Sequence, residues 1–542
     1  MKEQVRLEVT RALPDGSHLE APVAAFDIDV EKSEQGERAV SAQQICEVVQ
    51  QVTGRPLLFY DPGFMNTAAA TSRITYVDGE NGVLLYRGYP IEQLAARSSF
   101  LEVAYLLVFG ELPTREQLRE WSDEVMRHAF VHEALLVYER KFRYNAHPMG
   151  VLVATLASMS TYHPDANPSL HAENIFDHPA AHPDHDGKLL THVAKIVGQI
   201  PTLASLAYRH RIGRPYNYPM PSLYADEQDD DTGRASGTGS RSKIYEQDER
   251  KKYDYTRNFL YMLDRLSEPD YQPNEELVRA LDVLFIVHAD HEFNCSTSTV
   301  RHLASVRVDP YSACAGGAAA LYGPLHGGAS EGVVRMLHRI GAKENVRSFL
   351  DRVMAKEELL VGFGHRIYKN YDPRARVLKE HAHKVFELMK SSASASSRGS
   401  VEDGMGSSGC SSDGTQQHTA STEVLIDIAE ELERCALEMP YFVSRMLYPN
   451  VDFYSGVIYT AMGFPLDMFP VLFAIPRAVG WLAHYREVIQ DDNLSNTRSI
   501  CRPSVLYDGD DAGTASPQKA PEVDHSLLSS RRLLSRRLSS LP

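Results

Sequence analysis

The helical spacing of apolar residues is the feature that most limits what this chain can fold into. Asn274 and the two glutamates after it form a typical helix start, with a capping side chain and an acidic first turn. Apolar residues then recur every three or four positions as far as Phe285, and segment 424–439 repeats this spacing. Strict alternation of apolar and polar residues is scarce outside the N-terminal region. We therefore expect a mainly α-helical fold with a small N-terminal β element.

Two low-complexity segments, residues 226–252 and 391–421, interrupt this pattern. Both are rich in small and polar residues, so neither can bury enough apolar surface to offset the entropy lost on ordering. We predict two disordered surface loops, with a regulatory or partner-binding loop as the alternative. Residues 509–542 are a further polar segment with two arginine pairs near the end. We interpret it as a disordered, solvated tail, with a targeting or membrane-surface signal as the alternative.

Charge and cysteine usage exclude several classes of protein. The 542-residue chain has a formal net charge of −16, which disfavours nucleic acid and anionic membranes as partners. An anionic substrate would need a locally basic pocket. The six cysteines are scattered and form no CxxC pair, which argues against a disulfide framework or a zinc ribbon. We therefore expect a globular protein of a reducing compartment.

Targeting signals leave the compartment open. The most apolar stretch, residues 468–476, is shorter than the roughly 20 residues of a membrane span and has a charged residue at each end. Many acidic residues at the N-terminus distinguish it from a secretory signal or a mitochondrial transit peptide. The ending Leu541-Pro542 is not the Ser-Lys-Leu peroxisomal signal. We take the cytoplasm as the default and keep the mitochondrial matrix and the peroxisome as alternatives.

The segment His288-Ala-Asp-His291-Glu contains residue types that can bind metal ions. On a helix, positions 288 and 291 share a face. However, the spacing is not the HExxH pattern of zinc hydrolases, and apolar residues lie just upstream. The residues alone leave three interpretations open: core histidines, substrate contacts or metal ligands.

Two further histidines lie among glycines, which let the backbone approach a ligand closely. His326 comes just before a helical stretch, and a helix N-terminus favours a neutral imidazole that can donate a hydrogen bond. A tight turn with an incidental histidine is the alternative. His365 begins a segment with several basic residues, which suits an anion pocket in an acidic chain. Neither segment has the spacing of a dinucleotide-binding or Walker loop.

Asp452 and two late arginines complete the candidate residues. Asp452 has apolar neighbours, and an apolar setting raises the pKa of a carboxyl and strengthens it as a base. A helix-capping role after the turn at Pro449 is the alternative. Arg477 interrupts an apolar stretch, so we expect it to be buried with a partner. Arg502, taken alone, is typical of a surface arginine.

Taken together, these segments resemble the citrate synthase family, which includes citrate synthases and 2-methylcitrate synthases of the bacterial type. The resemblance runs from about Gly54 to Tyr507, excluding the insertions, and its motifs follow the order of the family. The matching strings are HADHEFNCSTSTVR, LYGPLHGGASEGV, GFGHRIYKNYDPRARV, LYPNVDFYSGVIYTAMGF, IPRAVGWLAHYRE and CRPSVLY.

The resemblance implies a two-domain, almost entirely helical fold that assembles at least as a homodimer. Residues 1–53 would form the leader with the small β element. A large domain would comprise residues 54–327, including insertion 226–252, and residues 464–508. A small domain that carries much of the coenzyme A site would comprise residues 328–463, including insertion 391–421.

The resemblance also assigns roles to individual residues. Asp452 is expected to remove a proton from the acetyl methyl group, His326 to stabilise the enol oxygen, and His365 to protonate the carbonyl of oxaloacetate. Oxaloacetate itself would contact His291, Arg374, Arg477 and Arg502, the last from the neighbouring subunit. Contacts to coenzyme A are expected from Gly362, Phe363, Gly364 and Lys369.

The expected activity is therefore condensation of acetyl-CoA with oxaloacetate, followed by hydrolysis of citryl-CoA to citrate and coenzyme A. Acetyl-CoA acts as a co-substrate, and no tightly bound cofactor or metal is needed. The partners are small molecules and other copies of this chain. The alternatives are a 2-methylcitrate synthase that uses propionyl-CoA, a non-catalytic homologue with a structural or regulatory role, and a metal-dependent hydrolase built on His288 and His291.

Overall fold

The computed structural model describes residues 4–9, 24–32, 38–53, 59–167, 185–220, 253–268, 270–398, 413–490 and 500–503. The predicted loop 226–252 and the tail 509–542 lie outside these ranges. The chain divides into two compact units, one of residues 1–70 with 502–542 and one of residues 71–501. The proposed division of the helical part into a large and a small domain stays a prediction.

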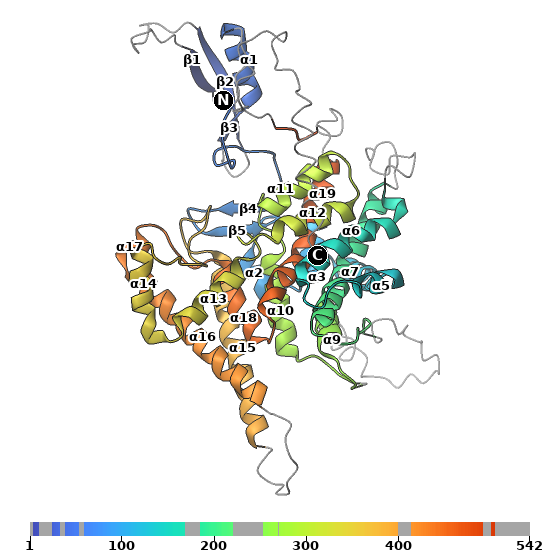
Figure 1. The fold of residues 1–542 in the computed structure, drawn as a ribbon. Coiled ribbons are helices and arrows are strands. Elements are labelled where there is room, and N and C mark those ends of the chain that lie inside the picture. The colour runs from blue at the N-terminus through green and yellow to red at the C-terminus, as the bar shows by residue number, and fades with distance from the viewer. Residues whose placement is uncertain are drawn as a thin grey trace, which may run out of the picture. The chain divides into compact units, whose positions relative to one another are not determined.

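The first unit contains the expected N-terminal β element. Strands β1 (Gln4–Val9) and β2 (Ala24–Lys32) pair antiparallel, and β3 (Arg38–Val40) pairs antiparallel with the far end of β2. The register places Gln4 opposite Asp29 and Val9 opposite Ala24. Helix α1 (Ala42–Thr53) follows the third strand (Figure 1).

The second unit opens with a small antiparallel sheet, β4 (Thr75–Asp78), β5 (Val83–Tyr86) and β6 (Tyr89–Pro90), and is otherwise helical. The mainly helical fold expected from the sequence is confirmed. Its α-helices are α2 (Ile91–Arg97), α3 (Phe100–Phe109), α4 (Arg115–Arg127), α5 (Glu133–Glu139), α6 (Pro148–Met159), α7 (His185–Arg211), α9 (Asp254–Asp264), α10 (Glu275–His288), α11 (Cys295–Ser305), α12 (Pro310–Leu321), α13 (Ala329–Ile340), α14 (Val346–Met354), α15 (Pro373–Arg398), α16 (Asp413–Glu438), α17 (Pro440–Val443), α18 (Val451–Ala461) and α19 (Phe469–Gln490). Short 3-10 turns are η1 (Ser160–Tyr162), η2 (Pro164–Ala166), η4 (Lys343–Asn345) and η5 (Leu466–Met468).

Local sequence explains where several of these helices begin. Ser99 and Glu102 form a capping box at the start of α3, in which each side chain accepts a hydrogen bond from the other residue's backbone. Asn274 caps α10 as predicted, because its side-chain oxygen accepts from the amides of residues 276 and 277. Asn450 caps α18 in the same way, so Asp452 lies in the first turn of that helix and is not its cap.

Helix α19 lies at the centre of this unit and packs against α3, α7, α10, α11 and α12 (Figure 1). It approaches α10 so closely that a Cβ at Gly480 would lie 2.4 Å from the carbonyl oxygen of Ala289. The stretch Leu466–Gln490 is long and apolar enough to cross a membrane, but 89% of its most apolar window is buried in the fold. This stretch is longer than the apolar segment 468–476 expected from the sequence, because the helix continues past Arg477. Its burial identifies it as a core helix.

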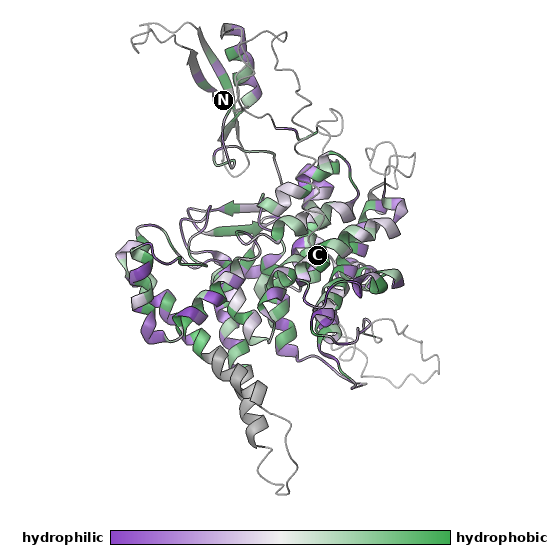
Figure 2. Ribbon diagram, viewed as in Figure 1, coloured by the Kyte–Doolittle hydropathy of each residue, from purple (hydrophilic) through white to green (hydrophobic). Residues whose placement is uncertain are grey.

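Helices α13 to α18 form a second group, in which α18 packs against α13, α15 and α16. Hydrophobic and hydrophilic residues lie on different faces of many of these helices (Figure 2). The low-complexity segment 391–421 differs from the predicted loop, because α15 continues to Arg398 and α16 begins at Asp413. The two helices extend into sequence that contains Ser and Ala. Adding such residues to a helix that is already nucleated requires little free energy.

Candidate active site

A glycine loop places His365 beside the start of α18. Gly362 and Gly364 have φ values of +81° and +79°, and a Cβ at Gly362 would lie 2.6 Å from the side chain of Val333. The amide of Gly364 donates to the carbonyl of Tyr448 at 2.7 Å, and the amide of Asn450 donates to the carbonyl of Gly362 at 2.9 Å. The two loops therefore run side by side. At both positions a residue with a side chain would be strained, because φ is positive and a Cβ would be too close to a neighbouring side chain.

The imidazole of His365 has a defined tautomer. Its Nδ1 accepts hydrogen bonds from the backbone amides of Ile367 at 3.1 Å and Tyr368 at 3.3 Å. A ring nitrogen that accepts carries no proton, so in the neutral ring the proton is on Nε2. Burial, together with the nearby Arg374, lowers the pKa of His365 to about 4. His365 is thus a neutral hydrogen-bond donor at pH 7.

His326 lies in the turn between α12 and α13, partly buried. Its Nε2 is 3.0 Å from the hydroxyl oxygen of Ser296, which also accepts from the indole N–H of Trp481 at 3.0 Å. Burial, with a contribution from Arg477, lowers the pKa of His326 to about 4. The neutral ring predicted from the sequence is therefore supported by an environment that disfavours its charged form.

Asp452 occupies the first turn of α18, and its backbone amide donates to the side chain of Asn450 at 3.0 Å. Its Oδ1 is buried without a hydrogen-bond partner among the described residues. Burial raises the pKa of Asp452 to about 7, although Arg374 and Arg477 act in the opposite direction. A carboxylate with a near-neutral pKa and an unoccupied oxygen has the properties of a general base.

Arg374 is buried at the start of α15 and forms a two-pronged ion pair. Its Nε and Nη2 donate to the two carboxylate oxygens of Asp372 at 3.1 and 2.8 Å. Asp372 also accepts from the amide of Val451 at 3.1 Å, so this pair joins α15 to α18. Burial opposes the charged form, but Asp372 raises the pKa of Arg374 above its usual value.

Arg477, on α19, is equally buried, but no carboxylate of the described residues lies within hydrogen-bond distance of it. Its Nε donates to the carbonyl of His288 at 2.7 Å, and its guanidinium lies 4.8 Å from the ring centre of Phe473. Neither terminal nitrogen makes a hydrogen bond to the residues that the structure describes. Burial lowers the pKa of Arg477 to about 10, so the group keeps its charge at pH 7.

His291 completes the cluster. Its Nε2 lies 3.1 Å from the hydroxyl of Tyr368, and its ring is roughly perpendicular to that of His365 with centroids 5.2 Å apart. Burial lowers the pKa of His291 well below its usual range, and Arg374 is the largest of the cations that add to this effect. The structure thus brings together six predicted site residues, namely His291, His326, His365, Arg374, Asp452 and Arg477.

The remaining candidates have different surroundings. Phe363 packs against Phe453, with ring centroids 4.9 Å apart. Lys369 is exposed and pairs with Glu80 at 2.8 Å. Arg502 belongs to the other compact unit, so its relation to the cluster stays a prediction.

His288 lies in the core beside the cluster and does not line it. It is fully buried, with its Nδ1 3.2 Å from the hydroxyl of Tyr459 and its ring 4.2 Å from that of Phe473. These contacts favour the interpretation of His288 as a core histidine. In the part of the chain that the structure describes, no three His, Cys, Asp or Glu residues lie close enough to hold a metal ion.

Three supporting residues were missed in the sequence. Asp372 and Ser296 hold Arg374 and His326, as described above. Glu433, buried on α16, accepts hydrogen bonds from the hydroxyls of Tyr371 at 2.6 Å and of Tyr454, and from the ammonium of Lys379 at 2.8 Å. The Asp-Pro helix start at Asp372 was visible in the sequence, whereas Ser296 and Glu433 depend on partners distant in the chain.

Comparisons with known proteins establish the family of this chain. The family described as "Citrate synthase, C-terminal domain" matches residues 63–504. The peroxisomal citrate synthase of Dictyostelium discoideum is 50% identical over 454 residues, 84% of this chain and 78% of that protein. The glyoxysomal citrate synthase of Cucurbita maxima is 40% identical over 89% of this chain and 79% of its own length. The crystal structure of citrate synthase from Pyrobaculum aerophilum superposes with a TM-score of 0.63 at 28% identity, covering 91% of this chain and 97% of that one. The chain therefore belongs to the citrate synthase family.

Proposed function

We propose that this chain condenses acetyl-CoA with oxaloacetate and hydrolyses the resulting citryl-CoA to citrate and coenzyme A. The observation that carries the proposal is the combination in one cluster of a buried carboxyl with a pKa near 7, neutral histidines and two buried arginines. Such a site can enolise a thioester and hold a dicarboxylate at the same time. The family membership supports the same reaction.

Asp452 is the proposed base. The methyl group of a thioester is a very weak acid, so its proton is removed quickly only if the base is unencumbered and the enolate is stabilised as it forms. The unpartnered Oδ1 of Asp452 meets the first condition. Its pKa of about 7 makes it a stronger base than a solvated aspartate while leaving it ionised in a useful fraction of molecules.

His326 is the proposed donor to the enol oxygen, and Ser296 is its positioning residue. The hydroxyl of Ser296 donates to the side-chain oxygen of Asn294 at 2.7 Å, and its one proton would have to turn to His326 Nε2, 3.0 Å away, for the proposed role. When that proton points to His326, the imidazole proton must be on Nδ1 and can face the substrate. One such preorganised donor is typically worth about 3 kcal/mol of transition-state stabilisation.

His365 is the proposed acid that protonates the carbonyl oxygen of oxaloacetate as the carbon–carbon bond forms. Its Nδ1 is occupied by two backbone amides, so the Nε2–H is the only proton that the neutral ring can give. The loss of that proton leaves an imidazolate unless a proton returns from solvent or product. The nearby Arg374 favours the more negative state of the ring, and Asp372 opposes it.

The two carboxylates of oxaloacetate are proposed to bind Arg477, Arg374 and His291, with Arg502 added by a neighbouring subunit. Arg477 is the principal receptor, because its terminal nitrogens make no hydrogen bond within the described residues and its charge is not neutralised by a paired acid. Arg374 uses one edge of its guanidinium for Asp372 and has Nη1 left for substrate. Activity would then depend on a dimer or a larger homo-oligomer.

Coenzyme A is proposed to lie along the loop Gly362–Gly364, with Lys369 near its phosphates. Of these three residues Gly364 is partly exposed, and a glycine lets a ligand approach the backbone closely. Hydrolysis of citryl-CoA would follow in the same site after closure around the substrates, which keeps water out until condensation is complete. Acetyl-CoA is a co-substrate, and none of these steps requires a bound cofactor.

The test is release of the coenzyme A thiol from acetyl-CoA in the presence of oxaloacetate. Thiol release that depends on both substrates supports the proposal, and its absence from the purified chain contradicts it. A parallel measurement with propionyl-CoA addresses the alternative of 2-methylcitrate synthesis. One methylene in a pocket is worth about 1–3 kcal/mol, so a clear preference in kcat/KM identifies the acyl group.

The compartment is proposed to be the peroxisome or a related organelle, because relatives named peroxisomal and glyoxysomal match most of the chain. This replaces the cytoplasm as the leading interpretation. Imaging of the full-length chain, labelled internally so that both ends stay free, would test it. Colocalisation with a peroxisomal marker supports the proposal, and a diffuse cytoplasmic or mitochondrial signal contradicts it.

A further inference from the structure

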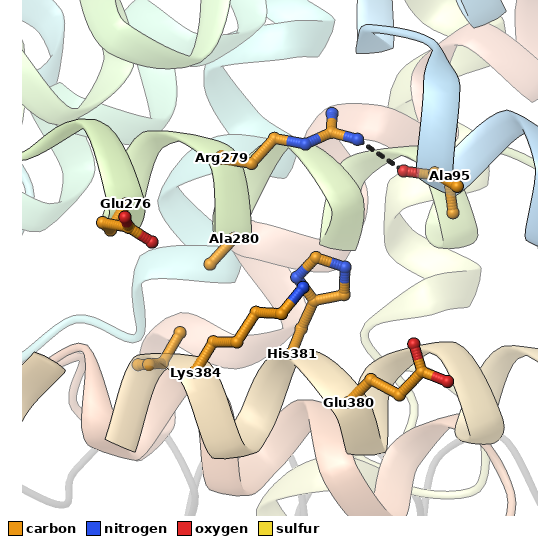
Figure 3. Close-up of a pocket in the computed structure, with 9 residues that line it drawn as sticks. Ala95, Glu276, Arg279, Ala280, Glu380, His381 and Lys384 are labelled. Carbon is orange, nitrogen blue, oxygen red and sulfur yellow. Dashed lines mark hydrogen bonds between the residues drawn. The ribbon is translucent and has the colours of Figure 1, made fainter. Parts of the chain in front are cut away.

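A recess away from the active site lies between α2, α10 and α15 (Figure 3). Its volume is about 270 Å³, and its charged lining consists of Glu276, Arg279, Glu380, His381 and Lys384. The residues come from the N-terminal part of α10 and from α15 two turns beyond Arg374. None of them has a role in the proposed reaction.

Arg279 is held rigidly at the edge of this recess. Its Nη2 donates to the carbonyl of Ala95 at 2.6 Å and its Nη1 to the carbonyl of Ser98 at 3.0 Å, so the guanidinium joins α10 to α2 (Figure 3). Its acidic neighbour is Asp282, 3.4 Å from Nη1. Burial raises the pKa of Asp282 to about 7, so its carboxyl neutralises Arg279 only partly.

His381 and Lys384 face the same space from α15, one turn apart (Figure 3). Neither side chain makes a hydrogen bond or ion pair with the residues that the structure describes. Burial lowers the pKa of His381 to about 4, and the charges that add to this effect are Lys384 and Arg279, with no carboxylate opposing them. Two cations therefore lie near the imidazole, and Glu276 and Glu380 also line the recess.

We propose that this recess binds a small phosphate-type oxyanion, held by Arg279, His381 and Lys384. His381 and Lys384 line the recess without a hydrogen-bond partner among the described residues, and Arg279 adds the Nε that its bonds to Ala95 and Ser98 leave unused. Several N–H donors and two cations around one small space suit an oxyanion. The volume admits a phosphate group but not a whole nucleotide, of which only the phosphate would enter. The two glutamates disfavour an extended polyanion such as nucleic acid or a membrane surface.

The position of the recess predicts a coupling to the active site. Helix α15 begins with Arg374 of the substrate cluster, and α10 ends at His288, whose carbonyl holds Arg477. An anion that contacts both helices stabilises the arrangement in which these two arginines lie together. By linkage, bound phosphate should then tighten binding of oxaloacetate, and oxaloacetate should tighten binding of phosphate by the same factor.

The experiment is calorimetric titration of the full-length protein with inorganic phosphate, with the active site saturated by oxaloacetate and coenzyme A. Potassium chloride at matched ionic strength controls for screening, and adenosine monophosphate tests whether an esterified phosphate also enters. Saturable binding of phosphate, with or without the nucleotide, supports the proposal. No saturable binding, or an equal response to chloride, overturns it. The readout needs no turnover, so it is independent of the proposed reaction.

Two variants assign the binding to this recess. Lys384→Ala removes one exposed donor and should weaken phosphate binding about tenfold or more, as expected for loss of a charge-assisted hydrogen bond. Glu380→Gln removes a repelling charge and should strengthen binding about threefold, a gain that misfolding cannot produce. Lys141→Ala, at an exposed lysine outside both sites, is the matched control and should bind like the wild type. Unchanged binding in both Lys384→Ala and Glu380→Gln would exclude this site.

Discussion

The cluster has a proton-transfer side, formed by Asp452, His326 and His365, and an anion-binding side, which contains Arg374 and Arg477. Burial affects the charge of the two sides differently. Asp452, His326 and His365 have no fully compensating charge, so burial drives each toward its neutral form. Arg374 keeps its charge because Asp372 is buried with it. Arg477 lies between these cases, since it is still charged but has a lowered pKa.

This difference shows how one small volume can contain both kinds of chemistry. A neutral acid and a weakly ionised base can exchange protons with a substrate at neutral pH, whereas a paired arginine cannot. A charge with an incomplete set of partners, such as that of Arg477, is instead available to a substrate carboxylate. Four changes would break or sharpen this comparison.

The largest effect is expected from Asp452→Asn. The amide has the same shape but cannot accept the methyl proton, so kcat should fall by about 1,000-fold. Steady-state thiol release from acetyl-CoA measures the loss. Binding of oxaloacetate, followed by calorimetry, should change little because Asp452 lies on the proton-transfer side. A variant that keeps more than a tenth of wild-type kcat would remove Asp452 from the role of base.

The same variant provides its own folding control. The pKa of Asp452 is about 7 in the folded chain, against 3.8 for an ordinary aspartate. The free energy of unfolding therefore decreases as pH rises from 3.8 to about 7, because the unfolded chain releases this proton more readily. Asp452→Asn removes this decrease and should stabilise the protein at pH 8 by up to about 4 kcal/mol, with a smaller gain at pH 5. Thermal unfolding at both pH values is the measurement. A loss of stability at pH 8 would contradict the burial argument.

The two arginines should differ when each is replaced by glutamine. Arg374→Gln leaves Asp372 buried without its partner and should destabilise the fold by about 3–5 kcal/mol. Arg477→Gln breaks no ion pair, so its effect on stability should be small, while the KM for oxaloacetate rises about tenfold or more. Denaturant unfolding and initial rates separate the two outcomes. Equal stability losses would mean that the hydrogen bond from Arg477 to the carbonyl of His288 stabilises the fold as much as the ion pair of Arg374.

Much of this comparison could be anticipated from the sequence, but not its supporting contacts. The motifs identified every member of the cluster, and local signals such as the Asn274 cap were confirmed. The tautomer of His365 and the pairing of Arg374 required coordinates, although their partners lie within three residues. Ser296 and Glu433 could not be predicted, because Trp481 and Tyr371, which contact them, are brought near only by tertiary packing.

Other features lie beyond local sequence for different physical reasons. The helical ends of segment 391–421 depend on nucleation by the preceding and following turns, which composition does not report. The role proposed for Arg502 would depend on a neighbouring subunit, so no pattern within one chain can establish it. The acyl group depends on the shape of a pocket at the scale of one methylene.

The pH dependence of kcat/KM should follow the groups that keep or lose charge. Activity should rise with a slope of one as Asp452 ionises near pH 7, and fall again as Arg477 loses its proton near pH 10. Between pH 6 and pH 8 the increase should be about tenfold. His326 and His365 titrate near pH 4 and should add no limb in this window. A limb at pH 6.5 with Asp452 present would instead indicate a solvated histidine.

The smallest effect is expected from Glu433→Gln, which acts through the helices that carry the two sides of the site. Glu433 accepts from Tyr371 on the loop before Arg374 and from Tyr454, two residues after Asp452. A glutamine keeps the shape but has one acceptor fewer and no charge for Lys379, so stability should fall by about 1–3 kcal/mol.

Because Glu433 positions these groups and touches no substrate, its loss should lower kcat only about threefold and raise the KM for oxaloacetate by a similar factor. Glu438→Gln is the matched control, since Glu438 lies on the same helix in an exposed pair with Arg434 and should change neither value. A purely structural role would lower stability without altering the rates of the folded enzyme at low temperature. Such a result would separate Glu433 from the site and leave Asp372 as the contact that aligns α15 with α18.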